Sequence, residues 1–335
     1  MAASIDLTDE FRRALDLLEA GSNVFLTGKA GTGKSTLIRE FISRTERNVV
    51  VTAPTGIAAL NVDGYTLHRL FGLHPSISLS EVQSGRYYPA RFAETLKALE
   101  TLIVDEVSMV RADLFDQVAA ALERFGPKPG QPFGGVQVVL VGDLLQLPPV
   151  VTEHEQTYFE TEYHTPYFFS AHNYSRELFP SISLTKVFRQ LGDTQMTSIL
   201  NSIREGLLLE TAQQDLNAHV DANFEPLQDE FWLTLTTTNR IASARNRQRL
   251  ERLSTELHVH HAHSTGELEG FEPPTDEALE FKIGAQVMML TNHPGDQWAN
   301  GTLGQVEQIG RTRFDETCVA IRLQDNDLVW ASPHT

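Results

Sequence analysis

One string of residues has the composition and spacing of a phosphate-binding loop. Gly28-Lys-Ala-Gly-Thr-Gly33-Lys34-Ser35 fits the pattern G-x-x-x-x-G-K-[ST]. Its glycines allow backbone N–H groups to surround phosphate oxygens at the positive end of the following helix. Lys34 is expected to reach the β- and γ-phosphates, and Ser35 to hold Mg²⁺. The predicted nucleotide-binding residues are Gly28, Ala30, Gly31, Thr32, Gly33, Lys34, Ser35 and Thr36.

A second string supplies carboxylates to the same site. Leu102-Ile-Val is an apolar run that ends in Asp105 and Glu106. If the run is a strand of a parallel sheet, Asp105 lies at its carboxyl edge, where it reaches Mg²⁺ through water. Glu106 is then the base that orients and deprotonates an attacking water. The alternative is a strand that simply ends in solvated acids.

The elements around these strings alternate between strands and helices. Short β-branched runs predict strands, and helical spacing of apolar residues predicts the helices between them. This alternation is typical of an α/β fold with a parallel sheet that is covered on both faces. The predicted strands are 24–27, 49–53, 102–105, 136–141, 181–184 and 232–238, and the helices are 8–20, 33–43, 112–124, 194–204 and 239–253. Short strands with turns follow residue 253 and predict a small β-rich unit.

Composition limits the class of protein. The 335 residues are 41% hydrophobic and 21% charged, as in an ordinary globular protein. The net charge of −17 argues against coating of nucleic acid through bulk charge, although a local basic channel remains compatible with it. Cys318 is the only cysteine, which excludes an internal disulfide. Neither a signal peptide nor a membrane span is apparent, so we expect a cytoplasmic protein with no membrane partner.

Five further sequence motifs accompany the phosphate-binding loop and the Asp105-Glu106 motif along the chain. They are Ala53-Pro-Thr-Gly-Ile-Ala-Ala-Leu60, Thr66-Leu-His-Arg-Leu-Phe-Gly72, Val141-Gly-Asp-Leu-Leu-Gln-Leu-Pro-Pro149, Thr185-Lys-Val-Phe-Arg-Gln190 and Gly284-Ala-Gln-Val287. Together they resemble superfamily 1 DNA helicases, and most closely the petite-integration-frequency (Pif) family and its RecD-like relatives. The resemblance runs from Val24 to about Val306.

The resemblance implies a division into domains. A RecA-like P-loop motor domain is expected over residues 1–180, followed by the start of a second RecA-like motor domain over 181–253. Residues 254–335 are expected to form a β-rich insertion with linking strands, which leaves the second motor domain incomplete. The family's late motifs, a Gln-Gly-x-Thr string and an Ala-Leu-Ser-Arg-like string, do not occur in these 335 residues. We therefore expect a fragment whose motor activity is impaired on its own.

The resemblance also assigns two residues around the γ-phosphate. Gln146 is expected to sense this phosphate, and Arg189 to reach it from the second motor domain. With Lys34, Asp105 and Glu106 they complete the predicted catalytic set. Judged without the resemblance, Gln146 is a polar residue in a proline-rich turn and Arg189 is a surface arginine.

Contacts with single-stranded DNA are implied at two places. The first group is Pro54, Thr55, Gly56, Thr66, His68 and Phe71. A Thr-Gly turn at a helix start offers N–H and hydroxyl groups to a phosphate, and aromatic rings stack on bases. The second place is Asn300-Gly301, for which an ordinary hairpin turn is the alternative. Phe71 is equally compatible with a place in the core.

The activity implied is that of an ATP-dependent helicase that moves 5′ to 3′ on single-stranded and tailed duplex DNA in repair, recombination or replication. ATP and Mg²⁺ are the implied cofactors, and a monomer is expected. The glutamine that reads adenine in this family is missing near Phe11-Arg12. Two other classes stay open: a nucleotide-gated clamp on single-stranded DNA, and a P-loop kinase or regulatory nucleotide hydrolase.

Two clusters stand outside these motifs. Arg245, Arg249 and Arg252 share a helix face that tracks a phosphate backbone or is simply solvated. His258 and His260 would share a strand face, where exposed imidazoles are favoured over a metal site.

Overall fold

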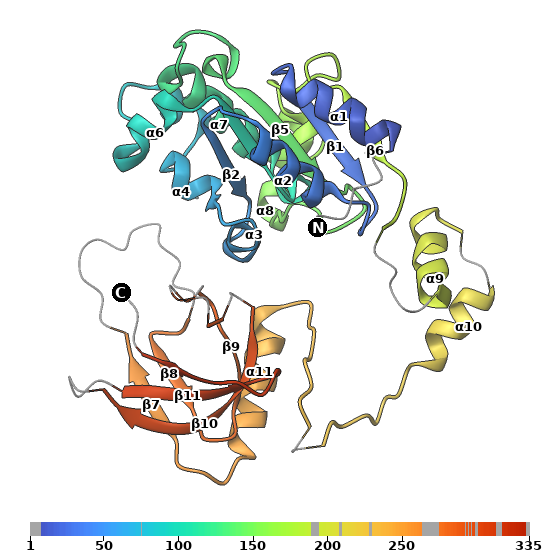
Figure 1. Ribbon diagram of the computed structural model, residues 1–335, viewed down its shortest axis with the longest axis vertical. Helices are drawn as coiled ribbons and strands as arrows, with labels where there is room; N and C mark the ends of the chain where they lie inside the picture. The colour runs from blue at the N-terminus through green and yellow to red at the C-terminus, as the bar shows by residue number, and fades with distance from the viewer. Residues whose placement is uncertain are drawn as a thin grey trace. The chain divides into compact units, whose positions relative to one another are not determined.

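A computed structural model describes residues 8–74, 76–188, 194–207, 210–227, 230–262, 275–291, 293, 295, 297–298, 301–312 and 317–332. The chain divides into two compact units, Met1–His219 and Val220–Thr335 (Figure 1). The domain boundaries expected at residues 180 and 253 remain predictions. In the part of the chain that is described, no helix is both long and apolar enough to cross a membrane.

The first unit is built on a six-stranded sheet in the order β3-β2-β4-β5-β1-β6, and each neighbouring pair is parallel. The strands are β1 Val24–Gly28, β2 Val49–Ala53, β3 Tyr65–Thr66, β4 Thr101–Val104, β5 Gln137–Gly142 and β6 Ser181–Leu184. The predicted α/β fold with a parallel sheet is confirmed, and β-branched runs form its central strands. Only the two-residue β3 had no signal in the sequence.

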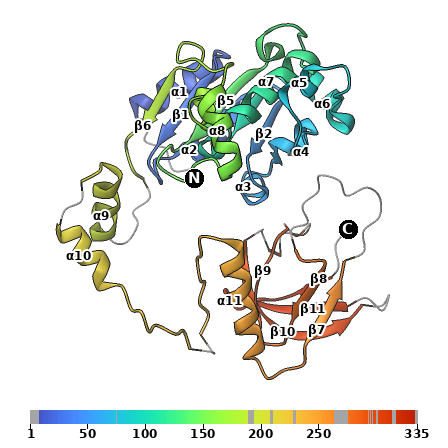
Figure 2. The ribbon, with the colours of Figure 1, turned by 180° about the vertical axis from the view of Figure 1, so that it is seen from behind.

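Helices cover both faces of this sheet (Figures 1 and 2). Side chains of a strand alternate between faces, so Ile103 packs in one core cluster while Leu102 and Val104 pack in the other. One face carries α1 Asp9–Glu19 and α2 Lys34–Arg44. The other carries α4 Leu67–Phe71, α5 Leu79–Gln83, α6 Ala93–Ala98 and α7 Ala112–Phe125. The central strands are continuously apolar because helices bury their side chains on both faces of the sheet.

Strand order sets the position of the site. In a parallel sheet all carboxyl ends lie at one edge, and ligands bind outside that edge. The neighbours β2, β4, β5 and β1 end at this edge in a row. They lead into Pro54, Asp105, Asp143 and the phosphate-binding loop.

The first unit also holds four further α-helices and four 3₁₀ turns. They are α3 Gly56–Asn61, α8 Glu153–Glu162, α9 Thr194–Arg204, α10 Glu210–Ala218, η1 Ala90–Phe92, η2 Val107–Met109, η3 Pro132–Gly135 and η4 Phe168–Ser170.

The second unit contains α11 Asn239–Glu251 and the antiparallel pair β7 His258–His261 and β8 Ala278–Phe281. Its four-stranded antiparallel sheet has the order β12-β11-β10-β9, with β9 Gln286–Met288, β10 Leu303–Arg311, β11 Thr317–Leu323 and β12 Leu328–Ala331. The predicted β-rich region is confirmed.

One predicted strand is wrong. Residues 232–238 have no regular secondary structure, and their apolar side chains are exposed, with Leu235 at 86%. A strand is stable only when a neighbour pairs with its backbone. No strand in the described part of the chain pairs with this segment, so its alternating pattern forms no strand here.

The arginine face of α11 has contacts within its own unit. Arg245 and Arg252 form ion pairs with Glu225, at 3.6 and 2.9 Å, and Arg249 donates to the backbone oxygen of Pro226. These contacts anchor the preceding segment on the helix. The described residues include no group of three or more histidine, cysteine or acidic side chains that could hold a metal ion.

Candidate nucleotide and DNA site

The phosphate-binding loop connects β1 to α2, as its mechanism requires. Gly31 and Gly33 have φ values of 77° and 89°, where a side chain is strained. A Cβ on Gly28 would lie 2.6 Å from the backbone oxygen of Leu184 on β6, so only glycine fits between these strands. Thr32 is buried and donates its hydroxyl to the backbone oxygen of Lys29. Ala30, Ser35 and Thr36 lie exposed along the loop and the first helical turn.

The Lys34 side chain lies back across this loop. Its Nζ donates to the backbone oxygens of Gly28 and Lys29, at 2.7 and 3.1 Å. Burial lowers the pKa of Lys34, while the charges of Asp143, Glu106 and Asp105 oppose that shift. The Lys34 ammonium therefore lies within the electrostatic reach of three carboxylates. A polyphosphate bound in the loop would add further negative charge around it.

Asp105 and Glu106 follow β4 directly. Asp105 accepts a hydrogen bond from the backbone N–H of Glu106 at 2.9 Å, which fixes its carboxylate. Glu106 has a φ of 49°, a strained value for a residue with a side chain, and such strain is common at functional sites. Burial raises the pKa of both carboxyls, and the Asp105 charge raises that of Glu106 further. A raised pKa suits a carboxylate that must accept a proton from water.

Asp143 is a site residue to which the sequence analysis gave no role. It follows β5 and is only 1% exposed. Its carboxylate accepts hydrogen bonds from the side chain of Gln146 at 3.2 Å and from both terminal nitrogens of Arg204 at 2.7 Å. Gln146 itself is exposed, while its amide nitrogen is held by Asp143. The sequence did contain a signal for Asp143, because this acid directly follows an apolar strand, as Asp105 does.

The groups at this edge suit Mg²⁺. The ion prefers hard oxygen ligands and usually completes its shell with water and substrate phosphates. Ser35 offers an exposed hydroxyl in the first turn of α2, and Asp105 offers a carboxylate two strands away in the same row. Asp105 also lies within electrostatic reach of Lys34. These residues fit the ion, although no described contact joins them.

The predicted DNA contacts lie at the carboxyl ends of β2 and β3. The hydroxyls of Thr55 and Thr66 accept hydrogen bonds from the backbone N–H groups of Ala58 and Arg69, so each caps a helix. Pro54 is half-buried, and the space beside Gly56 is open. The structure thus places these residues at two adjacent helix starts on the same edge of the sheet as the nucleotide loop, with β4 and β5 between β2 and β1.

His68 occupies the first turn of α4 and is half-buried. Burial lowers its pKa, and the charge of Arg111 lowers it further. Both effects favour the neutral form of the imidazole. An aromatic ring at such a position can stack on a base.

Three other predicted contacts have different outcomes. Phe71 is 0% exposed and its backbone oxygen accepts the hydroxyl of Tyr87, so a DNA contact by this ring is wrong and the core alternative holds. Gly301 lies between β9 and β10, with a φ of 85°, and donates to the backbone oxygen of Met289. This is the geometry of a turn, and its DNA contact stays a prediction. Asn300 and Arg189 lie outside the described residues.

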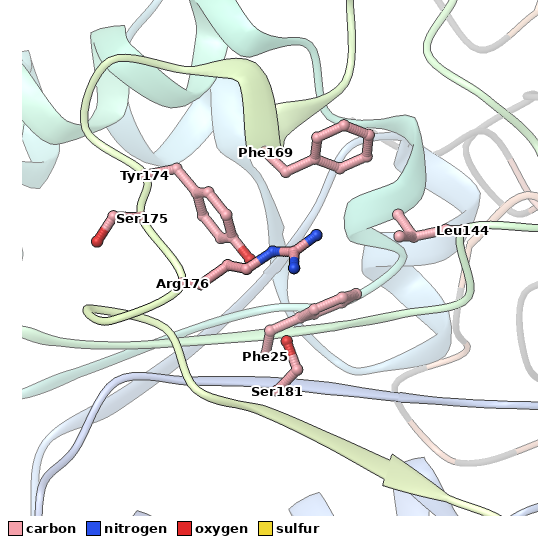
Figure 3. Close-up of a pocket in the computed structure, with 7 residues that line it drawn as sticks. All are labelled: Phe25, Leu144, Phe169, Tyr174, Ser175, Arg176 and Ser181. Carbon is pink, nitrogen blue, oxygen red and sulfur yellow. The ribbon is translucent and has the colours of Figure 1, made fainter.

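A separate pocket of about 660 Å³ lies beside β1 and β6 (Figure 3). Its lining includes the rings of Phe25, Phe169 and Tyr174, and the Arg176 guanidinium extends among them. Leu144 connects it to the loop that carries Gln146. None of the predicted site residues lines this pocket, so the nucleotide loop is not part of it.

Comparisons with known proteins agree with these motifs. A family model for PIF1-like helicases matches residues 6–213. The chain is 33% identical to the ATP-dependent DNA helicase PIF1 of Saccharomyces cerevisiae over 322 residues, which cover 90% of this chain and 36% of that protein. It is 33% identical to the ATP-dependent DNA helicase Pif1 of Bdellovibrio bacteriovorus, over 91% of this chain and 68% of that protein.

The fold is similar as well. The crystal structure of Pif1 helicase from Bacteroides in complex with ADP-AlF3 and ssDNA has a TM-score of 0.76 and 31% identity, over 98% of this chain and 74% of that one. The chain spans about a third of the yeast relative's length and about two thirds of the bacterial one. The resemblance expected from the motifs is confirmed, and the chain belongs to the family of PIF1-like helicases.

Proposed function

We propose that this chain is the core of an ATP-dependent helicase that translocates on single-stranded DNA. The observation that carries the proposal is the row of groups at the carboxyl edge of the sheet. There the loop with Lys34, the acids after β4 and the helix starts after β2 and β3 follow one another. Relatives named ATP-dependent DNA helicases, one of them crystallised with a nucleotide analogue and ssDNA, support it.

In the proposed reaction each residue has a separate task. The loop N–H groups and Lys34 bind the phosphates of ATP. Glu106 orients the attacking water and accepts its proton, and Gln146 contacts the γ-phosphate through its amide. Arg189 supplies a further positive charge to that phosphate. Ser35 and Asp105 would hold Mg²⁺, which neutralises charge on the β- and γ-oxygens when it is bound.

The DNA partners are single strands and duplexes with a single-stranded tail, and the proposed direction is 5′ to 3′. Closure of the site on ATP and opening after hydrolysis would move the chain along DNA. Duplexes that differ only in carrying a 5′ or a 3′ tail test the direction, with protein in excess over DNA because the motor activity of this chain on its own is expected to be impaired. Strand separation that requires the 3′ tail would contradict it.

His68 gives the DNA proposal a direct test. If its neutral ring stacks on a base, His68→Ala should lower the affinity for single-stranded DNA by about 1–3 kcal/mol. Stacking releases no counterions, so the loss should be the same at every salt concentration, while the affinity of both proteins falls with salt. A fluorescence anisotropy titration of a labelled oligonucleotide at several salt concentrations measures both effects.

The matched control is His219→Ala, since His219 is an exposed histidine that follows α10 in the same unit. This variant should bind DNA as the unaltered chain does. An affinity unchanged by His68→Ala removes this ring from the DNA site.

A further inference from the structure

The carboxyl end of α9 is joined to the nucleotide site by two consecutive charged residues. Arg204 binds Asp143 with both terminal nitrogens, at 2.7 Å each. Glu205 forms an ion pair with Lys29 of the phosphate-binding loop, at 3.5 Å. The first pair is largely enclosed, with the side chain of Asp143 2% exposed and that of Arg204 24%. The second is exposed and contributes little.

The position of Asp143 creates an electrostatic problem for nucleotide binding. Its charge acts on both Lys34 and Glu106, so it lies within electrostatic reach of the groups proposed to handle the γ-phosphate. A buried carboxylate repels a bound polyanion unless a cation compensates it. Asp143 also accepts hydrogen bonds from the backbone N–H of Leu145 and from the side-chain amide of Gln146, and both of these donors are neutral. Arg204 supplies the compensating positive charge.

The same pair also fixes geometry. A bidentate guanidinium–carboxylate pair holds both oxygens in one plane. One of these oxygens, Oδ2, accepts from Arg204 and from the amide of Gln146. Arg204, at the end of α9, therefore fixes the Asp143 carboxylate, and this carboxylate in turn orients the side-chain amide of Gln146.

We propose that Arg204 is a positioning residue of the nucleotide site, which neutralises Asp143 so that a terminal phosphate can bind beside it and holds Asp143 in place to orient Gln146. The proposal rests on the proposed function, because it assumes that a nucleoside triphosphate occupies the loop. It makes a specific claim about charge. Loss of Arg204 should penalise a triphosphate more than a diphosphate, and removal of the Asp143 charge should reverse the loss.

The test is a binding titration with two probes, Mg·ATPγS and Mg·ADP. Arg204→Ala should weaken binding of the triphosphate by about 10- to 100-fold, the range expected for one uncompensated charge in a partly buried site. Binding of the diphosphate should fall by a smaller factor. The double variant Arg204→Ala with Asp143→Asn should return triphosphate affinity to within about threefold of the unaltered chain, since a one-unit charge change is then cancelled.

Folding is controlled in two ways. Arg204→Gln keeps a polar side chain, shorter than that of arginine and without the charge, so it decides the question if Arg204→Ala does not fold. Arg322→Ala removes an arginine that forms a bidentate pair with Glu307 in the second unit, and it should leave nucleotide affinity unchanged. Circular dichroism melting of every variant shows which ones are folded at the temperature of the titration.

Failure of this inference and failure of the proposed function give different results. If the unaltered chain does not bind Mg·ATPγS, the proposed function is wrong. If it binds and the folded Arg204 variants bind equally well, Arg204 has no positioning role. If the double variant binds as weakly as Arg204→Ala, Arg204 does not act through the charge of Asp143, and the inference is overturned.

Discussion

Glu106→Gln is expected to lower the rate of ATP hydrolysis by about 10²–10⁴-fold while nucleotide binding is retained. Glutamine has the shape of glutamate and can still orient a water molecule, but it cannot accept the proton. Glu106 stands beside Asp105 and within reach of Lys34, so the substitution also removes one negative charge from the site. Nucleotide affinity should therefore stay the same or rise. Phosphate release measures the rate, and a fluorescent nucleotide measures binding.

The control for this variant is Glu94→Gln, which removes an exposed carboxylate from the first turn of α6. It should hydrolyse ATP at the rate of the unaltered chain. Normal turnover by Glu106→Gln would mean that another group activates the water, and Glu106 would then be one of the solvated acids that commonly end a strand.

Lys34→Ala is expected to weaken Mg·ATP binding by about 10²-fold or more, because hydrogen bonds to charged groups are among the strongest in proteins. The Nζ of Lys34 donates to the backbone oxygens of Gly28 and Lys29, which holds its positive charge against the loop. Without it, the glycine-rich loop still offers N–H groups, but its remaining cation, Lys29, is already paired with Glu205. Titration with a fluorescent ATP analogue in the presence of Mg²⁺ measures the loss.

Lys97→Ala is the matched control, because Lys97 lies exposed in the last turn of α6. Its nucleotide affinity should equal that of the unaltered chain. Tight Mg·ATP binding by a folded Lys34→Ala variant would mean that the loop does not bind phosphate in the way its sequence indicates.

Local patterns predicted much of the fold. The strands that carry the site are continuous apolar runs because both faces of the sheet are covered, so their residue types alone identified them. The five predicted helices agree with α1, α2, α7, α9 and α11 to within two residues at each end, whereas α3, α4, α5, α6, α8 and α10 were not predicted. The phosphate-binding loop and the acids after β4 were predictable because each is contiguous in sequence.

Contacts between distant residues could not be predicted in this way. Arg204 and Asp143 are 61 positions apart, and an arginine at the end of a helix is usually a surface residue. The difference between Phe71 and His68 has a similar origin. Both lie on the short helix α4, and only the packing of that helix decides that the phenylalanine is buried and the histidine partly exposed.

The segment 232–238 shows the opposite limit. Its alternation of apolar and polar residues is a strand pattern. Such a pattern describes a single segment, whereas a stable strand also needs a neighbouring strand with which its backbone can pair. Hydrogen-bonding partners, rather than propensity, decided its conformation.

The most direct test of the proposed function is the rate of phosphate release from Mg·ATP with and without single-stranded DNA. The Glu106→Gln variant, prepared identically, gives the background from contaminating enzymes. A helicase core predicts a rate that rises with DNA concentration and saturates, because DNA at the helix starts after β2 and β3 shares one sheet edge with the nucleotide loop. A rate that is well above background and does not change with DNA would contradict the account and favour a P-loop kinase or regulatory nucleotide hydrolase.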